Sequence, residues 1–325
     1  MIIPRHWAES RLKHKKAGKQ MTVRRFGWSD ASQAEAQAMA DERASEAMRQ
    51  WLRGEKIARR EIKQVYGGGD GLPIREEIVR TEGDTVITRN SYGALCLNTP
   101  DVMFVDIDVD ESPRFRFSCG LGLAIVAVSI AAAFWQRQYG IFILCGAVLL
   151  LGAHGVLKLL NAAHRRAGKN PWDATLERIR RFSRERPDWQ LRLYRTPAGF
   201  RVLVAHALFD PRGPEAQECF QALGADPVYA RMCVNQRCFR ARISPKPWRA
   251  GMPEPLRPRP GVWPVKEEHL EKRRQWVAAY DAKAAGFAAC QFIESLGGLR
   301  ADPKAEAVGR LHDGGSRARS GLPLA

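Results

Sequence analysis

The sequence FSCGLGLAIVAVSIAAAFW spans residues 117–135, and YGIFILCGAVLLLGAHGVLKLL follows at residues 139–160 after three polar residues. The first run contains no formal charge, and the second carries only His154 and Lys158, both in its second half. A helix of roughly 20 apolar residues is long enough to cross the hydrocarbon core of a bilayer. The two runs therefore predict a transmembrane helical hairpin over residues 117–160. A buried helical hairpin is the alternative, but nothing in a domain of this length requires two adjacent apolar runs of this length.

Basic residues flank the predicted hairpin on both sides, while the turn between the two runs carries only Arg137. They are Arg114 and Arg116 before the hairpin, and His164, Arg165, Arg166 and Lys169 after it. Because cytoplasmic loops beside membrane helices carry the excess of lysine and arginine, we expect both termini in the cytoplasm. The sequence thus predicts a two-pass protein of the bacterial inner (plasma) membrane, whose basic flanks contact anionic lipid headgroups.

The whole chain is basic, with 52 Lys and Arg against 35 Asp and Glu and a formal net charge of +17. Two kinds of anionic partner explain such an excess, the inner leaflet of the membrane and a nucleotide or nucleic acid. The predicted hairpin favours the leaflet because it holds the chain at the membrane surface. Residues 1–29 form a basic N-terminal arm, for which lipid binding, nucleic-acid binding and plain solvation are all open.

The rest of the chain predicts an α+β fold, in which a mixed or antiparallel sheet with flanking helices is interrupted by the hairpin. Its two halves, residues 30–116 and 161–249, should share one sheet because the strands of each half need partners from the other. Three further segments are expected: a proline-rich linker at 250–264, an amphipathic helix at 265–298 and a disordered tail at 299–325. The expected strands cover residues 74–80, 85–89, 102–109, 189–194, 200–206 and 238–243.

Three aspartates, Asp106, Asp108 and Asp110, alternate with apolar residues along the predicted strand 102–109 and just past its end. Alternate residues of a strand share one face, so the three carboxylates are expected to project together. Their charges repel unless a cation lies among them, and oxygen ligands of this kind suit Mg²⁺ or Mn²⁺. All three are therefore candidate catalytic residues, with Asp106 and Asp108 as metal ligands. The alternative is a solvated face whose acids are neutralised by Arg114, Arg116, Arg195 or Arg201.

Two later motifs carry groups that bind phosphate or a nucleotide. The turn from Arg195 and Thr196 through Gly199 to Arg201 offers a hydroxyl, backbone donors and two guanidinium groups. The strand 238–243 carries Arg240 and Arg242 on one face and is followed by Lys246. Basic groups interleaved with Phe239 and Trp248 fit a nucleotide or nucleic-acid surface. An ordinary β-hairpin and a solvated basic edge strand are the alternatives.

The acidic strand, the turn with a hydroxyl and a glycine, and the basic strand come in an order that resembles the catalytic core of the archaeo-eukaryotic primase and primase-polymerase superfamily. The resemblance covers residues 102–249 without the hairpin. It implies that Asp106 and Asp108 bind divalent metal. It implies that Thr196, Gly199 and Arg201 lie at the nucleotide, and that Arg240 and Lys246 meet phosphates.

Two departures from that family stand out. Arg201 occupies the place of the family's histidine, and the nearest substitute for a third acidic residue on a later strand is Asp210. The N-terminal part is also similar to a bacterial family of two-pass membrane proteins to which no activity is attached.

Two functions follow from these observations. The first is a metal-dependent nucleotide-handling domain, a nucleotidyltransferase-like enzyme in an active or inactive form, anchored to the membrane. The second is a non-catalytic, membrane-anchored scaffold that binds anionic lipid or a protein partner. The face of Asp106, Asp108 and Asp110 and the basic motifs favour the first function, which is the sharper prediction. The missing third acid and the excess of positive charge favour the second, which stays the alternative.

Overall fold

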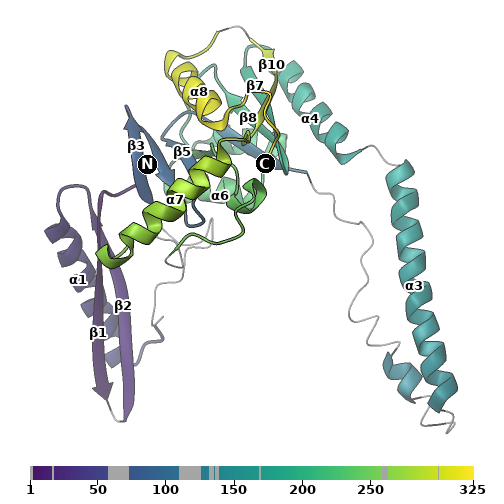
Figure 1. Cartoon of the computed structure of the whole chain (residues 1–325), viewed down its shortest axis with the longest axis horizontal. Helices are drawn as coiled ribbons and strands as arrows, with labels where there is room; N and C mark the ends of the chain where they lie inside the picture. The colour runs from purple at the N-terminus through teal and green to yellow at the C-terminus, as the bar shows by residue number, and fades with distance from the viewer. Residues whose placement is uncertain are drawn as a thin grey trace. The chain divides into compact units, whose positions relative to one another are not determined.

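The computed structural model of the protein describes residues 3–16, 18–57, 73–109, 126–131, 135, 139–167, 170–257, 263–298 and 300–325. The chain divides into two compact units. One consists of Met1–Asp108 together with Ile179–Ala325, and the other consists of Val109–Arg178. The described strands all belong to the first unit, which therefore holds the β structure of the fold (Figure 1).

The first unit begins with a two-stranded antiparallel ribbon, β1 (His6–Lys16) and β2 (Lys19–Ser29), and with helix α1 (Gln33–Leu52) packed on it. The side chain of Ser32 caps α1 by accepting a hydrogen bond from the backbone of Glu35 at 3.1 Å. A side chain at Gly27 would collide with the backbone of α1, so glycine lets helix and ribbon approach closely. The segment expected as a basic arm over residues 1–29 thus contains the two strands β1 and β2, because every second residue of these strands packs on a helix.

Two four-stranded antiparallel sheets form the rest of the β structure. The first has the order β3 (Glu77–Glu82), β4 (Thr85–Arg89), β5 (Leu95–Thr99), β9 (Phe239–Arg242). The second has the order β10 (Gln291–Gly297), β7 (Gln190–Thr196), β8 (Gly199–Val204), β6 (Phe104–Asp108).

Each sheet combines strands from before and after the second unit, Val109–Arg178, since β5 pairs with β9 and β6 pairs with β8. The α+β character and the sharing between halves are observed, but two sheets replace the single sheet that we predicted. The chain passes from one sheet to the other between β5 and β6, where Pro100 has no N–H with which to continue a ladder.

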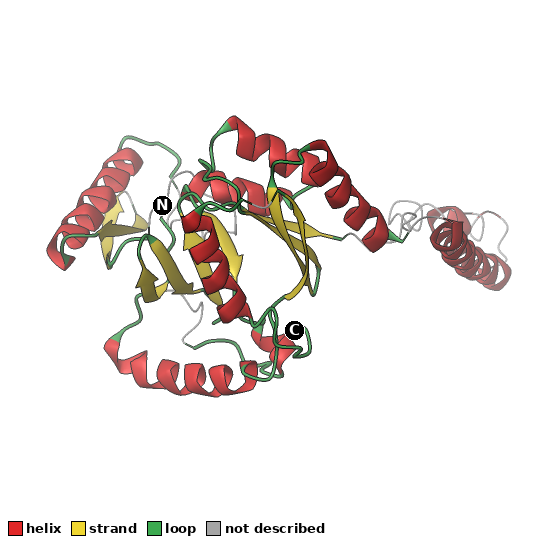
Figure 2. Cartoon of the chain, turned by 90° about the horizontal axis from the view of Figure 1, so that it is seen from above, coloured by secondary structure: helices red, strands yellow, loops and turns green. Residues whose placement is uncertain are grey.

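Helices lie around these strands (Figure 2). They are α4 (Pro171–Glu185), α5 (Pro214–Leu223), α6 (Pro227–Gln236), α7 (Leu270–Ala284), α8 (Pro303–Ser316) and the short 3₁₀ helices η1 (Pro247–Ala250) and η2 (Glu267–His269). Several begin with proline at the first turn, a position where the missing N–H costs nothing. The carboxylate of Asp226 caps α6 by accepting from the backbone of Val228 and Tyr229.

The C-terminal third differs from the expected pattern. The helix expected over residues 265–298 ends at Ala284, and β10 follows it and pairs with β7. The tail expected to be disordered over 299–325 contains α8, which Asp302 caps and which buries Ala305 and Val308. Its apolar residues are few, so composition alone hid the helix. Residues 250–257 of the expected linker are described as η1 and the loop after it, while 258–262 lie outside the described residues.

The second unit contains α3 (Tyr139–Ala167), and the first apolar run is described as helical only at residues 126–131 and 135. Within the described part of the chain, no helix is at once long enough and apolar enough to traverse a bilayer. The predicted transmembrane hairpin is therefore wrong, as are the membrane contact through two transmembrane helices and the inner-membrane localisation that rested on it. Helix α3 continues from its apolar run through His154 and Lys158 into the polar residues up to Ala167. The presence of an apolar run is therefore not enough to predict a membrane-spanning helix.

Candidate functional site

A two-point ion pair joins the predicted acidic strand to β8. Asp106 lies directly opposite Arg201 in the register of β6 and β8. The Nε and Nη2 atoms of Arg201 donate to the two carboxylate oxygens of Asp106 at 2.6 and 3.0 Å. Arg201 is 2% exposed and Asp106 is 29% exposed at the side chain. Burial lowers the pKa of Arg201, but the adjacent carboxylate more than offsets this and raises it, so the guanidinium stays charged.

The remaining donor of Arg201 links the second sheet to the first and to α8. Its Nη1 atom donates to the carbonyl oxygen of Arg242 at 2.8 Å and lies 3.2 Å from Nε2 of His312. Because arginine only donates, Nε2 must accept, and Nδ1 then carries the proton that faces Asp313 at 3.1 Å. Both Arg201 and His312 are buried. This hydrogen-bonded chain places the end of β9 beside β6.

Asp108 lies at the free end of β6, opposite Gly199, and is exposed to solvent. The backbone of Asp226 donates to the carbonyl oxygen of Asp106 at 2.9 Å, which brings the start of α6 to the same place. Partial burial, followed by the charges of Asp226 and Asp106, raises the pKa of the Asp108 carboxyl. The acidic strand therefore ends in a group of three carboxylates, of which Arg201 neutralises one.

Three cations face this acidic group from β9 and η1. They are Arg242 at the end of β9, Lys246 directly before η1, and Arg249 within η1. Partial burial lowers the pKa of Lys246, and the charges of Arg242 and Arg249 lower it further, while Asp108 opposes them. Partial burial and Arg242 likewise lower the pKa of Arg249. Like charges held close in this way gain stability when an anion lies among them.

One of these cations carries an unused donor. Nη1 of Arg249 is buried and has no hydrogen-bond partner among the described residues. A buried polar atom without a partner costs free energy that a ligand can recover. The cationic group, defined here as Arg242, Lys246 and Arg249, therefore has both the charge and a free donor for an anion.

Aromatic rings stand beside the cationic group. Nζ of Lys246 lies 5.5 Å from the ring centroid of Trp248, and Trp248 meets Tyr92 edge to face at 5.4 Å. Trp248 is 54% exposed, so its ring is open to a second planar group. A base-stacking position next to phosphate-binding cations is the arrangement that nucleotides require.

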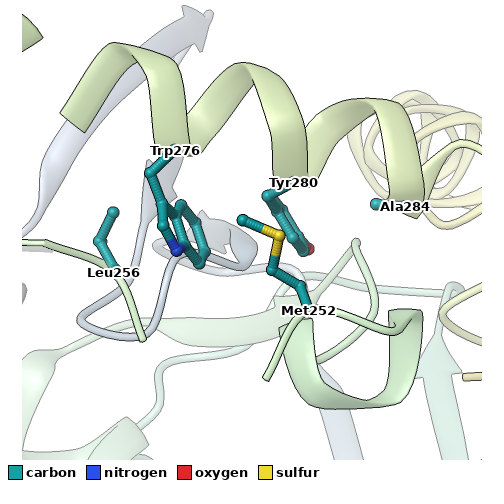
Figure 3. Close-up of a cluster of buried hydrophobic side chains, with 5 residues drawn as sticks. All are labelled: Met252, Leu256, Trp276, Tyr280 and Ala284. Atoms are coloured by element: carbon teal, nitrogen blue, oxygen red, sulfur yellow. The ribbon is translucent and has the colours of Figure 1, made fainter. Parts of the chain in front are cut away.

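A buried cluster on α7 supports the loop that carries Lys246. Trp276 and Tyr280 stack at 5.4 Å, and Met252 and Leu256 pack against them from the segment after η1 (Figure 3). The hydroxyl of Tyr280 lies 2.6 Å from Oγ of Ser244 and donates to the carbonyl oxygen of Pro245 at 2.6 Å. The position of Lys246 thus depends on a helix more than twenty residues further along the chain.

The other residues predicted for the site are placed as follows. Thr196 and Gly199 pair with each other across the β7–β8 turn, where Thr196 is buried and Arg195 is exposed. Nη2 of Arg240 donates to both carboxylate oxygens of Glu76, at 2.8 and 2.6 Å, where Arg240 is buried and Glu76 is mostly buried. Arg240 therefore forms an ion pair within the first unit, with Glu76 just before β3, and the arginine that lies near Lys246 is Arg242. Asp110 lies outside the described residues.

Among the described residues, no three His, Cys, Asp or Glu side chains come together as a group that could hold a metal ion. Both oxygens of Asp106 are taken by Arg201 and the carboxylate of Asp226 is taken by the backbone of α6. Only Asp108 of the predicted metal ligands is open. An ion at this place would draw most of its ligands from phosphate and water, as Mg²⁺ often does.

Sequence reasoning missed Asp226, Arg249 and His312. The Asp-Pro pair at 226–227 indicates a helix start, and Arg249 belongs to the basic run from 237 to 249. No sequence pattern indicated a role for His312, because that role depends on the packing of α8 against Arg201. Comparison with protein-family models, with curated proteins and with solved structures found no match to this chain.

Proposed function

We propose that this protein binds a nucleotide through its phosphates, at the cationic group formed by Arg242, Lys246 and Arg249. The observation that carries the proposal is the convergence of three partly buried cations in which one guanidinium nitrogen lacks a partner among the described residues. Phosphate oxygens accept from such a group with charge-assisted hydrogen bonds. Exposed Trp248 offers a ring on which a base can stack, which favours a nucleotide over inorganic phosphate.

The carboxylates at the end of β6 support nucleotide binding better than nucleotidyl transfer. In the primase-like interpretation, Asp106 and Asp108 hold divalent metal. The ion pair with Arg201 occupies both oxygens of Asp106, so that residue is a poor ligand. A bound Mg²⁺ or Mn²⁺ at Asp108 remains a prediction, and the binding experiment includes it as a separate arm.

The test is isothermal titration calorimetry of the full chain with ATP, and with tripolyphosphate as a probe that lacks a base. Lys246→Gln and Arg249→Gln should each weaken the binding of both ligands about tenfold or more, because each removes a charged hydrogen bond. Trp248→Ala should weaken the binding of ATP alone, by roughly fivefold or more. Lys266→Gln is the matched control, since Lys266 is 80% exposed and distant in sequence from the group.

Each titration is repeated with Mg²⁺, with Mn²⁺ and with no divalent ion. Tighter binding with the ion, abolished in Asp108→Asn, would support the predicted metal. The nucleotide proposal is overturned if millimolar ATP gives no binding heat, or if Arg249→Gln binds ATP as the parent does.

A further inference from the structure

The ribbon of β1 and β2 has one face covered by α1, and its opposite face is open over the outer part of the ribbon, beyond buried Trp7. Its pairing register places Arg11 opposite Arg24, Lys13 opposite Thr22 and Lys15 opposite Gln20. The alternate residues Ala8, Ser10, Met21 and Val23 are buried under α1. The first set therefore belongs to the face turned away from α1, because successive side chains of a strand point to opposite sides.

The outer half of that open face, defined here as the basic ladder, consists of Arg11, Lys13, Lys15, Gln20, Thr22 and Arg24. Arg11, Lys13, Lys15 and Gln20 are exposed, and Arg24 is partly exposed. The acid that contacts the ladder is Glu9, which pairs with both Arg11 and Arg24. From His6 to Ser29 the sequence has seven Lys and Arg against one Glu. The ladder thus retains a strong net positive charge.

Most acidic residues of the segment formed by β1, β2 and α1 lie on the helix. Helix α1 carries Glu35, Asp41, Glu42 and Glu46 against Arg43 and Arg49. The ribbon and the helix that covers it are therefore opposite in charge. A surface selected for solubility alone mixes both signs, whereas this one concentrates the positive sign on a single face. Such a segregation is typical of a surface that meets a polyanion.

From this arrangement we infer that the basic ladder binds the phosphate backbone of a nucleic-acid duplex. Lysine, arginine, threonine and glutamine are the side chains that contact phosphates. A two-stranded antiparallel ribbon also fits the major groove of B-DNA, where it lies between two rows of phosphates. The inference is separate from the nucleotide site and does not rest on it.

The aromatic residues of the ribbon explain why a duplex is favoured over a single strand. Proteins that bind single strands stack bases on open aromatic rings. On this ribbon, Arg75 covers Phe26 at 3.6 Å, and Arg43 covers Trp28 at 4.9 Å. His14 meets Trp51 of α1 edge to face at 6.2 Å. The ladder itself carries hydrogen-bond donors and no ring, so it offers contacts to phosphates rather than to unpaired bases.

The test measures the affinity of the full chain for a 24-bp DNA duplex of arbitrary sequence by fluorescence anisotropy, between 50 and 200 mM salt, roughly the range over which phosphate contacts dominate. The variant is Lys13→Gln/Lys15→Gln. It should raise the Kd about tenfold or more at 100 mM salt and lower the slope of log K against log salt by about 2, one for each phosphate that the variant no longer neutralises. Both residues are exposed, so folding should be preserved, which a thermal melt verifies.

The matched control is Lys266→Gln/Arg274→Gln, which removes the same charge from positions that are 80% and 72% exposed. It should change the salt slope little. The inference fails if the ladder variant and the control weaken duplex binding equally, because general charge would then explain the binding. It also fails if the parent binds a 24-nucleotide poly-dT strand more tightly than the duplex. Binding to vesicles with 30% phosphatidylserine that disappears in the ladder variant, without duplex binding, would assign the ladder to lipid and overturn the proposal.

Discussion

Arg201 on β8 holds Asp106 on β6 by both carboxylate oxygens, from a position almost fully enclosed by protein. The same guanidinium reaches the carbonyl oxygen of Arg242 and the ring of His312. One buried cation therefore satisfies an acid of the predicted metal site and ties the two sheets together. This relationship has consequences for stability that can be measured directly.

Replacing Asp106 with asparagine should cost about 3–5 kcal/mol of unfolding free energy, because it leaves the charge of Arg201 buried and unpaired. Urea denaturation at pH 7 measures the loss. Glu294→Gln is the control, since its partner Arg180 is 42% exposed, unlike Arg201, and this ion pair should contribute no more than about 1 kcal/mol. The double change Asp106→Leu/Arg201→Met should recover much of the loss. Equal effects of Asp106→Asn and Glu294→Gln would contradict a structural role for the pair.

Asp108 should make the folded protein less stable as pH rises. Its pKa is raised in the folded state by burial and by Asp226 and Asp106, so the folded chain binds its proton more tightly than the unfolded chain. Stability attributable to this group is therefore present below the unfolded pKa of about 3.9 and is lost as pH rises through the folded pKa. Asp108→Asn should stabilise the protein at pH 7 and should lose this advantage near pH 3. Denaturation curves at the two pH values provide the comparison.

The same variant separates two roles for the carboxylate. If Asp108 acts only as a neighbouring negative charge, Asp108→Asn should strengthen the binding of tripolyphosphate with or without Mg²⁺. If it holds a metal ion, the variant should weaken binding only in the presence of Mg²⁺. Calorimetry in the two buffers distinguishes these results.

Tyr280→Phe should weaken both the fold and the nucleotide site. The change removes the hydroxyl that contacts Ser244 and Pro245, and leaves a buried carbonyl oxygen without its donor. The expected loss is about 1–3 kcal/mol of unfolding free energy, with a weaker affinity for tripolyphosphate because Lys246 follows directly. Ser320→Ala removes an exposed hydroxyl and should change neither quantity by a measurable amount. Unchanged affinity in a destabilised Tyr280→Phe protein would show that the cluster of Figure 3 does not position Lys246.

The described cysteines should resist labelling until the protein unfolds. Cys96, Cys219, Cys233, Cys238 and Cys290 are free and buried. Burial raises the pKa of Cys219 and of Cys238 to about 12, which suppresses the reactive thiolate. In a Cys119→Ser/Cys145→Ser variant, these five thiols should react with Ellman's reagent at pH 8 only as fast as the protein unfolds. A stoichiometric burst within the first minutes would contradict the burial.

Local pattern was sufficient for several strands and for one ion pair. The clean alternation around the turn at Thr196–Gly199 predicted β7 and β8, which pair as a hairpin. The alternative in which an arginine neutralises the acidic strand named Arg201 among four candidates, and Arg201 is the partner of Asp106. The hairpin depends on residues that are close along the chain. Asp106 and Arg201 are 95 residues apart, so the two-residue period of each strand could predict the faces that they occupy but not that they pair.

Contacts between residues far apart along the chain could not be predicted from the sequence. The sequence could not indicate that Arg240 turns to Glu76 while Arg242 joins Lys246, because this depends on which strand lies beside β9. Nor could it indicate His312, whose helix has few apolar residues. The apolar runs at 117–160 predicted membrane spans because they are long and nearly uncharged, whereas α3 extends beyond its apolar run into polar residues up to Ala167.

The pairing of β5 with β9 also bears on how the protein is made. The backbone of Leu95 donates to the hydroxyl of Ser244, across 149 residues of sequence. A ribosome that adds roughly 5–20 residues each second needs on the order of 10–30 s to deliver the second partner after the first. During that time β5 and β6 emerge with open edges, and unpaired strand edges invite association with other chains. Because of this delay, we expect chaperones to bind nascent chains that end between residues 110 and 240.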